Sequence, residues 1–364
     1  MVTVGSAAVP TRGWLHERIK CRKRTDRKMT DAITIIVTSI SPPNRSLTAL
    51  AEGARERNWN FLVMGDTKSP GEFALDGCDF YDVARQEQSG FHYAKLCPTR
   101  SYTRKNIGYL LAMRAGAPMI VETDDDNIPR DEFWSEREVS FDAPLLNAAG
   151  WVNVYSYFTD VLLWPRGLPL DAVQQALPEY NSIERAVADC PIQQGLADGD
   201  PDVDAIYRLL LPLPQDFRRD RRIALGSGSW CPFNSQNTTW WPRAYPLMYL
   251  PAHCSFRMTD IWRSFVAQRI AWANGWSLLF HEPTVLQERN DHNLMRDFTD
   301  EVPGYLNNRA MGQALDELQL EPGAAKLGDN LRRCYRALVG NGWVGEGELA
   351  LLDAWLADIA QLSS

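Results

Sequence analysis

The stretch "IVETDDDNIP", residues 120–129, places three aspartates directly after an apolar run and just before a proline. The apolar, β-branched residues in front of the aspartates predict a buried strand. Three neighbouring carboxylates repel one another, so a chain that keeps them at one strand end needs a compensating interaction. A divalent cation provides it, because Mg²⁺ and Mn²⁺ prefer oxygen ligands and share them with phosphate groups. The open alternative is an acidic turn that caps a helix beginning near Pro129.

The sequence around the triplet predicts a parallel α/β sheet. Apolar runs predict buried strands at 33–40, 60–66 and 118–126, and helical spacing predicts helices at 44–59 and 104–116. Strands that alternate with helices form parallel sheets, and ligands bind at the carboxyl ends of such strands. The aspartates are therefore expected at the edge of the sheet where a binding site forms.

The spacing within the triplet predicts that its first and third aspartates act together and that the second does not. Residues two apart on an extended chain point to the same side. Asp124 and Asp126 are therefore expected to hold one Mn²⁺ or Mg²⁺ ion, while Asp125 faces the other way.

The composition is that of an ordinary soluble globular protein, because 45% of the 364 residues are hydrophobic and 23% are charged. The net charge of −8 argues against a nucleic-acid partner. No apolar run is long enough to predict a transmembrane segment or a secretory signal. Seven scattered cysteines without a CxxC pair argue against a disulfide framework and a zinc site, so we expect a cytoplasmic protein.

Three regions are predicted along the chain. Residues 1–30 carry eight lysines and arginines against two acidic residues, which predicts a disordered basic tail or an over-long start with Met29 as the initiator. Residues 31–300 are expected to form one α/β domain. Residues 301–364 contain three stretches with helical spacing and predict a helical extension, through which copies of the chain could associate.

Several segments resemble known families. An Asp-x-Asp after a strand of a nucleotide-binding domain is a signature of GT-A glycosyltransferases, and "KNIGYLLAMRAGAPMIVETDDDNIP" (105–129) resembles two related groups. One comprises the reversibly glycosylated polypeptides, which include the UDP-arabinopyranose mutases and share a "GY…IDDD" core. The closer likeness is to the STELLO family of plant glycosyltransferase-like proteins. Four collinear segments carry it: "NVYSYF…WPRGLPL" (153–170), "IQQGLADGDPDVDAIYRL" (192–209), "PFNSQNTTWW" (232–241) and "FRMTDIWRSFVAQRIAWANGWSLLFHEPTV" (256–285).

This resemblance implies a fold and an activity. The fold would be a GT-A-type, nucleotide-binding, Rossmann-like α/β sheet with a helical C-terminal extension. The activity would be the metal-dependent transfer of a sugar from a nucleotide-sugar donor, a UDP-sugar, to an unidentified acceptor. Two alternatives stay open: a nucleotide-sugar mutase with the same fold and metal, and a non-catalytic GT-A-like module that binds a partner.

The resemblance also assigns the metal ligands. Asp124 and Asp126 would ligate an ion that bridges the donor's diphosphate, while Asp125 would contact the ribose or hold the loop. The mutase group has a histidine in the segment where this sequence has Gln287. His292, five residues further on, is the candidate third ligand, and water is the alternative.

Residues at the ends of the first two strands are expected to bind the donor. Thr38 and Ser39 follow the first strand, and Asp66 follows the second, where such enzymes bind the nucleoside. Arg104 and Lys105 open the helix before the triplet and could pair with phosphate. The alternatives are that Asp66 is a turn residue and that Arg104 and Lys105 belong to a solvated helix start.

Arg166 aligns with the arginine that carries the transferred sugar in the reversibly glycosylated polypeptides. Those proteins have a second arginine where this sequence has Val173, so the machinery for self-glycosylation looks incomplete. Arg166 is therefore expected to contact the diphosphate or the sugar. The alternative is a guanidinium packed on Trp164.

The remaining candidates belong to the acceptor side of the site. Asp202 and Asp204 in an acidic loop, with Asn234 and Gln236 in a polar loop, suit recognition of sugar hydroxyls. Asp260 lies where the resemblance places an acidic residue that faces the acceptor and acts as the general base in inverting enzymes. The alternative is that Asp260 caps the helix that follows it.

Overall fold

A mixed α/β sheet forms the centre of the protein, and the computed structural model describes residues 32–290 and 292–362 together with Met1. The basic tail predicted for residues 1–30 lies, apart from Met1, outside the described residues. In order along the sheet, the strands are β3-β2-β1-β4-β12-β9-β13-β10-β6-β8, and β5 pairs with β13. A second, two-stranded sheet consists of β11 and β7.

The first part of the chain alternates strands and helices. Its elements are β1 (Thr34–Thr38), α1 (Arg45–Glu56), β2 (Asn60–Met64), β3 (Asp79–Tyr81), α2 (Val83–Glu87), α3 (His92–Leu96), α4 (Lys105–Arg114) and β4 (Ile120–Thr123). Helix α1 begins where predicted, because the Asn44 side chain accepts a hydrogen bond from the Leu47 N–H at 2.9 Å. Strands β3, β2, β1 and β4 are parallel, so their carboxyl ends lie at one edge.

The second part of the chain completes the sheet with strands of both directions. Its elements are β5 (Asn127–Pro129), β6 (Ser140–Leu146), β7 (Gly150–Trp151), β8 (Arg185–Asp189), β9 (Ile192–Gly199), α5 (Ala205–Leu210), β10 (Arg222–Leu225), β11 (Ser229–Trp230), β12 (Asn237–Trp240), α6 (Thr259–Ala273) and β13 (Leu278–Gln287). Strand β12 runs antiparallel to both of its neighbours, β4 and β9. This mixed α/β sheet with flanking helices is consistent with the predicted Rossmann-like GT-A fold.

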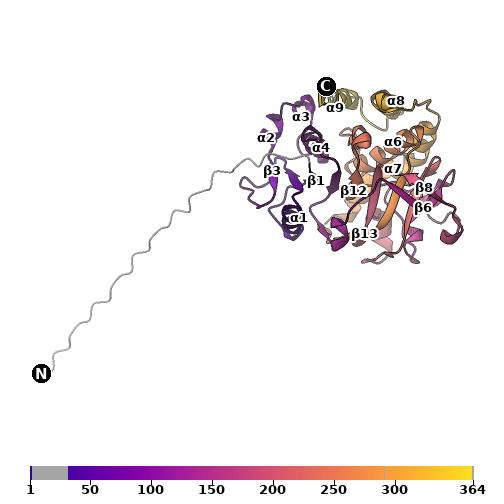
Figure 1. Ribbon diagram of the computed structural model, residues 1–364, viewed down its shortest axis with the longest axis horizontal. Coiled ribbons are helices and arrows are strands. Elements are labelled where there is room, and N and C mark those ends of the chain that lie inside the picture. Colours follow the sequence, from indigo (N-terminus) through magenta and orange to yellow (C-terminus); the bar gives the residue numbers. More distant parts are fainter. Residues whose placement is uncertain (2–31, 291, 363–364) are drawn as a thin grey trace.

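Helices form the C-terminal part, as predicted. They are α7 (Leu294–Asp316), α8 (Leu327–Gly340) and α9 (Glu348–Leu362). Helix α7 packs against α5 and α6, and α9 packs against α3 and α4 of the first part (Figure 1). The last helix therefore lies against helices that accompany the parallel strands. In the described ranges, no helix has the length and apolar character that a membrane span requires. The boundary at residue 301 and the association of copies stay predictions.

Three local expectations are corrected by the structure. The backbone at Asp125 and Asp126 forms a turn rather than an extended strand, and Asn127–Pro129 forms β5 rather than a helix start. The reason is tertiary, because β5 pairs antiparallel with the end of β13. Asp260 is not a helix cap either: α6 begins at Thr259 after a 3₁₀ turn, and no side chain caps it.

Candidate active site

A cavity of about 850 Å³ lies at the carboxyl ends of β1, β2 and β4, and we call it the aspartate cavity. Its lining includes residues that follow these strands: Thr38, Ser39, Asp66, Asp124, Asp125 and Asp126. The opposite wall comes from the second part of the chain: Arg166, Asp202, Gln236, Asp260, Gln287 and His292. A second cavity, of about 720 Å³, lies around the loop that follows β7, and no predicted site residue lines it.

Asp124 is held in place by a buried lysine. Its Oδ1 accepts hydrogen bonds from Tyr102 Oη at 2.6 Å and from Lys105 Nζ at 3.0 Å. The Lys105 side chain is fully buried, and its ammonium also donates to Tyr102 Oη, Thr123 O and Ser235 O at 2.7–3.0 Å. Lys105 therefore neutralises Asp124 from the protein interior. It does not line the cavity, which corrects its expected role as a phosphate contact.

Asp125 links the ends of two neighbouring strands. Its Oδ2 accepts a hydrogen bond from Ser39 Oγ at 2.5 Å, and its backbone oxygen accepts one from Asn44 Nδ2 at 2.7 Å. Burial raises the pKa of Asp125, and the hydrogen bond from Ser39 opposes that rise. The Ser39–Asp125 bond fixes the turn after β4 to the end of β1, so Asp125 holds the loop.

Asp126 has an oxygen without a partner. Its Oδ1 is buried and receives no hydrogen bond from the described residues, and Oε1 of Gln287 is in the same situation. The two side chains are neighbours, since Gln287 Nε2 donates to Asp126 Oδ2 at 3.4 Å. Burial first, and then the charges of Asp124 and Asp125, raise the pKa of Asp126 to about 7. Unpartnered oxygens on two contacting side chains, together with neighbouring carboxylates that repel one another, fit an oxygen-preferring cation.

His292 is engaged elsewhere. Its Nδ1 lies 3.1 Å from Asp297 Oδ2, and burial, followed by the charge of Arg289, lowers the pKa of His292. Among the residues that the structure describes, no three His, Cys, Asp or Glu side chains converge as a metal site. The structure therefore does not bring His292 together with Asp124 and Asp126, although all three line the same cavity.

The carboxylate of Asp66 fixes the backbone at one end of the cavity. It accepts hydrogen bonds from the backbone N–H groups of Thr67, Arg100 and Ser101 at 2.6–2.9 Å. Burial alone would raise the pKa of Asp66, but these three donors outweigh it and lower the pKa. Thr38, at the end of β1, also lines the cavity, and its buried Oγ1 has no partner among the described residues.

Arg104 is buried and still has a free donor. Its Nε donates to Gln86 Oε1 at 2.6 Å, and its Nη1 donates to Cys97 O at 3.2 Å. The remaining nitrogen, Nη2, has no hydrogen-bond partner among the described residues. Arg104 lines the cavity, so this N–H group is available to an oxygen atom of a ligand.

Arg166 lies between two aspartates. Its Nε and Nη2 donate to the two oxygens of Asp202 at 2.8 and 2.9 Å. Its Nη1 and Nη2 also donate to the two oxygens of Asp260 at 3.0 and 2.9 Å. Burial would raise the pKa of Asp202, but Arg166 outweighs it and lowers that pKa strongly. The alternative of a guanidinium packed on Trp164 is not what the structure contains, because Trp164 donates its indole N–H to Asp204 instead.

Hydrogen bonds connect the two ends of the aspartate cavity. Ser235 Oγ lies 2.6 Å from Tyr102 Oη, whose other partners are Asp124 and Lys105. The Ser235 N–H donates to Asp260 Oδ2 at 3.3 Å. The carboxylates of Asp124 and Asp260 therefore belong to one network.

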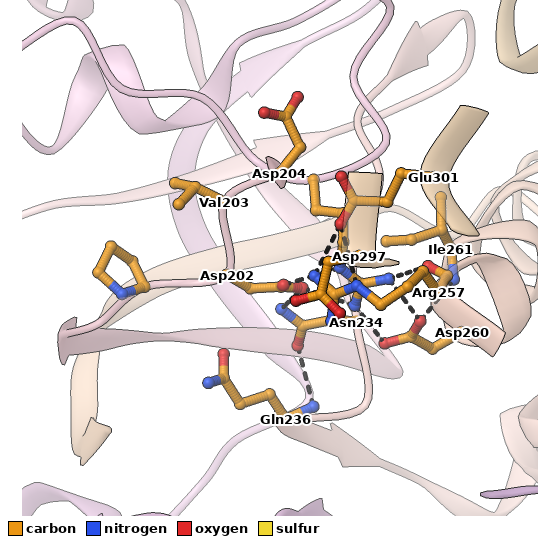
Figure 2. Close-up of polar contacts among 12 residues, drawn as sticks. Asp202, Val203, Asp204, Asn234, Gln236, Arg257, Asp260, Ile261, Asp297 and Glu301 are labelled. Carbon is orange, nitrogen blue, oxygen red and sulfur yellow. Dashed lines mark hydrogen bonds and ion pairs between the residues drawn. The ribbon is translucent and has the colours of Figure 1, made fainter. Parts of the chain in front are cut away.

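The predicted acceptor residues separate into two kinds. Gln236 and Asp202 line the cavity, and Asn234 supports Asp202 from behind with a hydrogen bond of 2.9 Å. Asp204 points away from Asp202 (Figure 2), and it does not line the cavity. Its Oδ1 caps α5 by accepting the Tyr207 N–H at 2.8 Å, and burial raises the pKa of Asp204 to about 6. Asp204 is therefore corrected from a sugar-binding residue to a structural one.

Some residues that line this cavity were not predicted from the sequence, among them Tyr102, Arg257, Arg289, Asn290 and Asp297. The polar run "QERNDHN" (287–293) begins at the last residue of β13, so the signal that identified the aspartate triplet, polar residues at a strand end, was present there too. Arg257 pairs with Glu301 at 2.8 Å and carried no local signal (Figure 2).

Fold and cavity together define an α/β protein with a polar ligand cavity at the carboxyl ends of its parallel strands. Its C-terminal residues 257–364 match the family model described as STELLO glycosyltransferases. "Probable glycosyltransferase STELLO2" of Arabidopsis thaliana is 30% identical over 75% of this chain and 38% of that protein. "Probable glycosyltransferase STELLO1" of the same plant is 28% identical over 89% of this chain and 44% of that protein.

These matches confirm the predicted resemblance to the STELLO family. The chain spans about two fifths of the length of these curated relatives, with 38% and 44% covered. The resemblance to the reversibly glycosylated polypeptides stays a prediction, because these matches do not bear on it. A solved structure titled "Crystal Structure of a Mycobacterial Protein" aligns with 77% of this chain and 75% of that chain at a TM-score of 0.35 and 8% identity, which is too distant to support any argument.

Proposed function

We propose that this chain is a glycosyltransferase domain that binds a nucleotide-sugar, a UDP-sugar, in the aspartate cavity. A glycosyltransferase transfers a sugar from such a donor to an acceptor, and both STELLO relatives are named as probable glycosyltransferases. Thr38, Ser39 and Asp66 would bind the nucleoside, because they line the cavity at the ends of the first two strands. The diphosphate would lie toward the aspartate triplet.

One observation carries this proposal. Nine buried side-chain atoms of the described residues make no hydrogen bond, and six of them belong to residues that line the aspartate cavity. One of the six, Arg257 Nη2, lies 2.8 Å from Glu301 Oε1 and has its charge compensated there. The other five lack any partner among the described residues: Thr38 Oγ1, Arg104 Nη2, Asp126 Oδ1, Gln287 Oε1 and Arg289 Nε. An unsatisfied buried polar group costs about 1–3 kcal/mol, so their concentration in one cavity indicates a polar ligand that supplies the missing partners.

The acidic and basic groups have separate roles in this proposal. When bound, Mn²⁺ or Mg²⁺ would neutralise charge on the departing nucleoside diphosphate. Asp126 and the free Oδ2 of Asp124 would hold the ion, since Oδ1 of Asp124 is committed to Tyr102 and Lys105. Arg104, with its free Nη2, would contact the phosphate groups.

The acceptor would enter beside Asp260. This residue lines the cavity, and both of its oxygens accept hydrogen bonds from Arg166. To act as a general base, Asp260 must exchange one of these bonds for a bond from the acceptor hydroxyl. Arg166 would keep the carboxylate oriented through its other nitrogens. Inversion and retention of the sugar's configuration both remain compatible with this arrangement.

The mutase alternative receives no support from the position of Arg166. An arginine that carries a transferred sugar must be reachable, whereas Arg166 is only 5% exposed and is paired with Asp202 and Asp260. Together with Val173 in place of the second arginine, this favours transfer over reversible self-glycosylation.

The test is a calorimetric titration of UDP in the presence of Mn²⁺ and, separately, of EDTA. We expect Mn²⁺ to raise UDP affinity by about tenfold or more, since each tenfold step corresponds to about 1.4 kcal/mol of added interaction. Asp126→Asn should remove most of this gain, and Asp353→Asn on the exposed face of α9 is the control. Equal affinity in both buffers, or no UDP binding at all, would contradict the proposal.

A further inference from the structure

The corner of the aspartate cavity between β5 and β13 contains a set of oxygen atoms that the sequence analysis did not combine. Gln287 is the last residue of β13, and its Cα pairs with that of Asn127 in β5, the residue directly after Asp126. The Glu288 N–H donates to the backbone oxygen of Asp126 at 3.0 Å, which fixes the two segments to each other. The side chains of Asp126 and Gln287 are therefore held side by side by the backbone.

The free atoms of these two side chains are both oxygens. Gln287 is 9% exposed, lines the cavity and has no hydrogen-bond partner for Oε1 among the described residues. Its other amide atom, Nε2, contacts Asp126 Oδ2 at 3.4 Å, so the amide is turned toward the carboxylate. Oδ1 of Asp126 is likewise unpartnered. Both of these unpartnered atoms are acceptors, so neither can satisfy the other, and a cation bound between the two contacting side chains would supply the missing partner of each.

We propose that Gln287 Oε1 is a direct ligand of the divalent cation, together with Asp126 Oδ1 and Asp124 Oδ2, so that the protein presents only oxygen atoms to the metal. Amide and carboxylate oxygens are the ligands that Mg²⁺, Mn²⁺ and Ca²⁺ prefer, whereas an imidazole would favour zinc and later transition metals. His292 is not part of this set, because its Nδ1 faces Asp297. This inference rests on the proposed function for its occupant, a cation that accompanies the donor.

The experiment measures the metal directly and needs no transfer activity. Mn²⁺ is titrated into the full chain with and without UDP, and free Mn²⁺ is followed by electron paramagnetic resonance. We expect Gln287→Ala to weaken Mn²⁺ binding by about tenfold or more, as loss of a supporting metal contact commonly does. His292→Ala should leave it within about twofold. Both variants are first compared with the wild type by thermal unfolding.

A second variant tests the selectivity rather than the strength of the site. Gln287→His introduces an imidazole at the same position and should shift the preference from Mn²⁺ toward Zn²⁺ and Co²⁺. Unchanged Mn²⁺ affinity in Gln287→Ala, or a larger loss in His292→Ala, would overturn the inference. UDP binding that does not depend on Mn²⁺ would overturn the inference about Gln287 and the metal dependence in the proposed function, but not nucleotide binding itself. Gln287-dependent Mn²⁺ binding without UDP binding would support it and contradict the proposed function.

Discussion

At the residue scale, the role of a charged side chain in this protein depends on its hydrogen-bond and ion-pair partners, which its position in the sequence does not reveal. Arg166 connects Asp202 and Asp260, and Lys105 stabilises Asp124 from inside the protein. A buried charge without such a partner is strongly destabilising. Substitution at these positions therefore changes folding as well as function, and each experiment must separate the two effects.

The role of Asp260 is tested by comparing it with the other partner of Arg166. Asp260→Asn should lower the rate of UDP-sugar hydrolysis by about 100-fold or more if Asp260 is the base, with donor affinity retained. Water stands in for the acceptor in this assay. The control is Asp202→Asn, which removes the other carboxylate partner of Arg166. It shows how much of the rate is lost when Arg166 loses one partner. A rate loss no greater than that of Asp202→Asn would mean that Asp260 only positions Arg166.

His281 predicts a pH dependence of stability. Burial first, and then the charge of Arg137, lowers the pKa of this partly buried histidine from 6.5 to about 4. As pH falls from about 6.5 to 4, the unfolded state binds the proton first, so the folded state loses stability. The stability is fully present above pH 6.5, and full protonation below pH 4 removes at most about 3 kcal/mol of it, at 1.36 kcal/mol per pKa unit.

The measurement for His281 is the difference in free energy of unfolding between the wild type and His281→Gln. This difference should change with pH only between about 4 and 6.5, because the glutamine does not titrate. Taking the difference cancels the contribution of the carboxylates, which titrate in both proteins. A difference that stays constant from pH 4 to pH 7 would contradict the assignment.

At the element scale, the last helix stabilises distant loops. Asp358 in α9 is 2% exposed and accepts hydrogen bonds from the backbone N–H groups of His92 and Tyr93 at 2.9 and 2.7 Å. These two residues begin α3, whose own N-cap residue, Phe91, has no side-chain acceptor. Glu348 at the other end of α9 accepts the N–H groups of Ala252 and His253. Helix α9 therefore caps one helix and fixes one loop elsewhere in the chain.

We predict that Asp358→Ala destabilises the protein by about 2 kcal/mol or more, because it leaves two backbone donors of α3 without their acceptor. Asp353→Ala on the same helix removes only an exposed ion pair with Arg332 and should cost less than about 1 kcal/mol. Chemical denaturation of both variants gives the two values. Similar losses for the two substitutions would show that α9 does not anchor α3.

At the scale of the whole molecule, the sheet brings residues that are far apart in the chain into one cavity. The ends of the parallel strands β1, β2 and β4 supply one wall with the aspartates, and residues beyond 160 supply the opposite wall. The C-terminal helices pack on both parts, so the two walls belong to one continuous fold (Figure 1). A ligand in this cavity contacts both parts at once and should stabilise the whole chain.

The sequence by itself determined the features that depend on local pattern. Apolar runs located β1, β2 and β4, helical spacing located α1, and the triplet was placed at the carboxyl end of a strand. These features follow from short-range periodicity and from the rule that parallel strands present their carboxyl ends together. Collinear motifs also identified the STELLO likeness, because a resemblance requires order along the chain rather than contacts in space.

Only the tertiary structure decided which of the polar residues face the cavity. The Lys105 side chain is buried in the protein interior, and Asp204 caps α5. Gln287, rather than His292, lies beside Asp126. The contact between Gln287 and Asp126 joins residues 161 positions apart and depends on how β5 pairs with β13. The direction of a side chain at a strand end changes with every one-residue shift in such a pairing, and a single sequence does not specify the register.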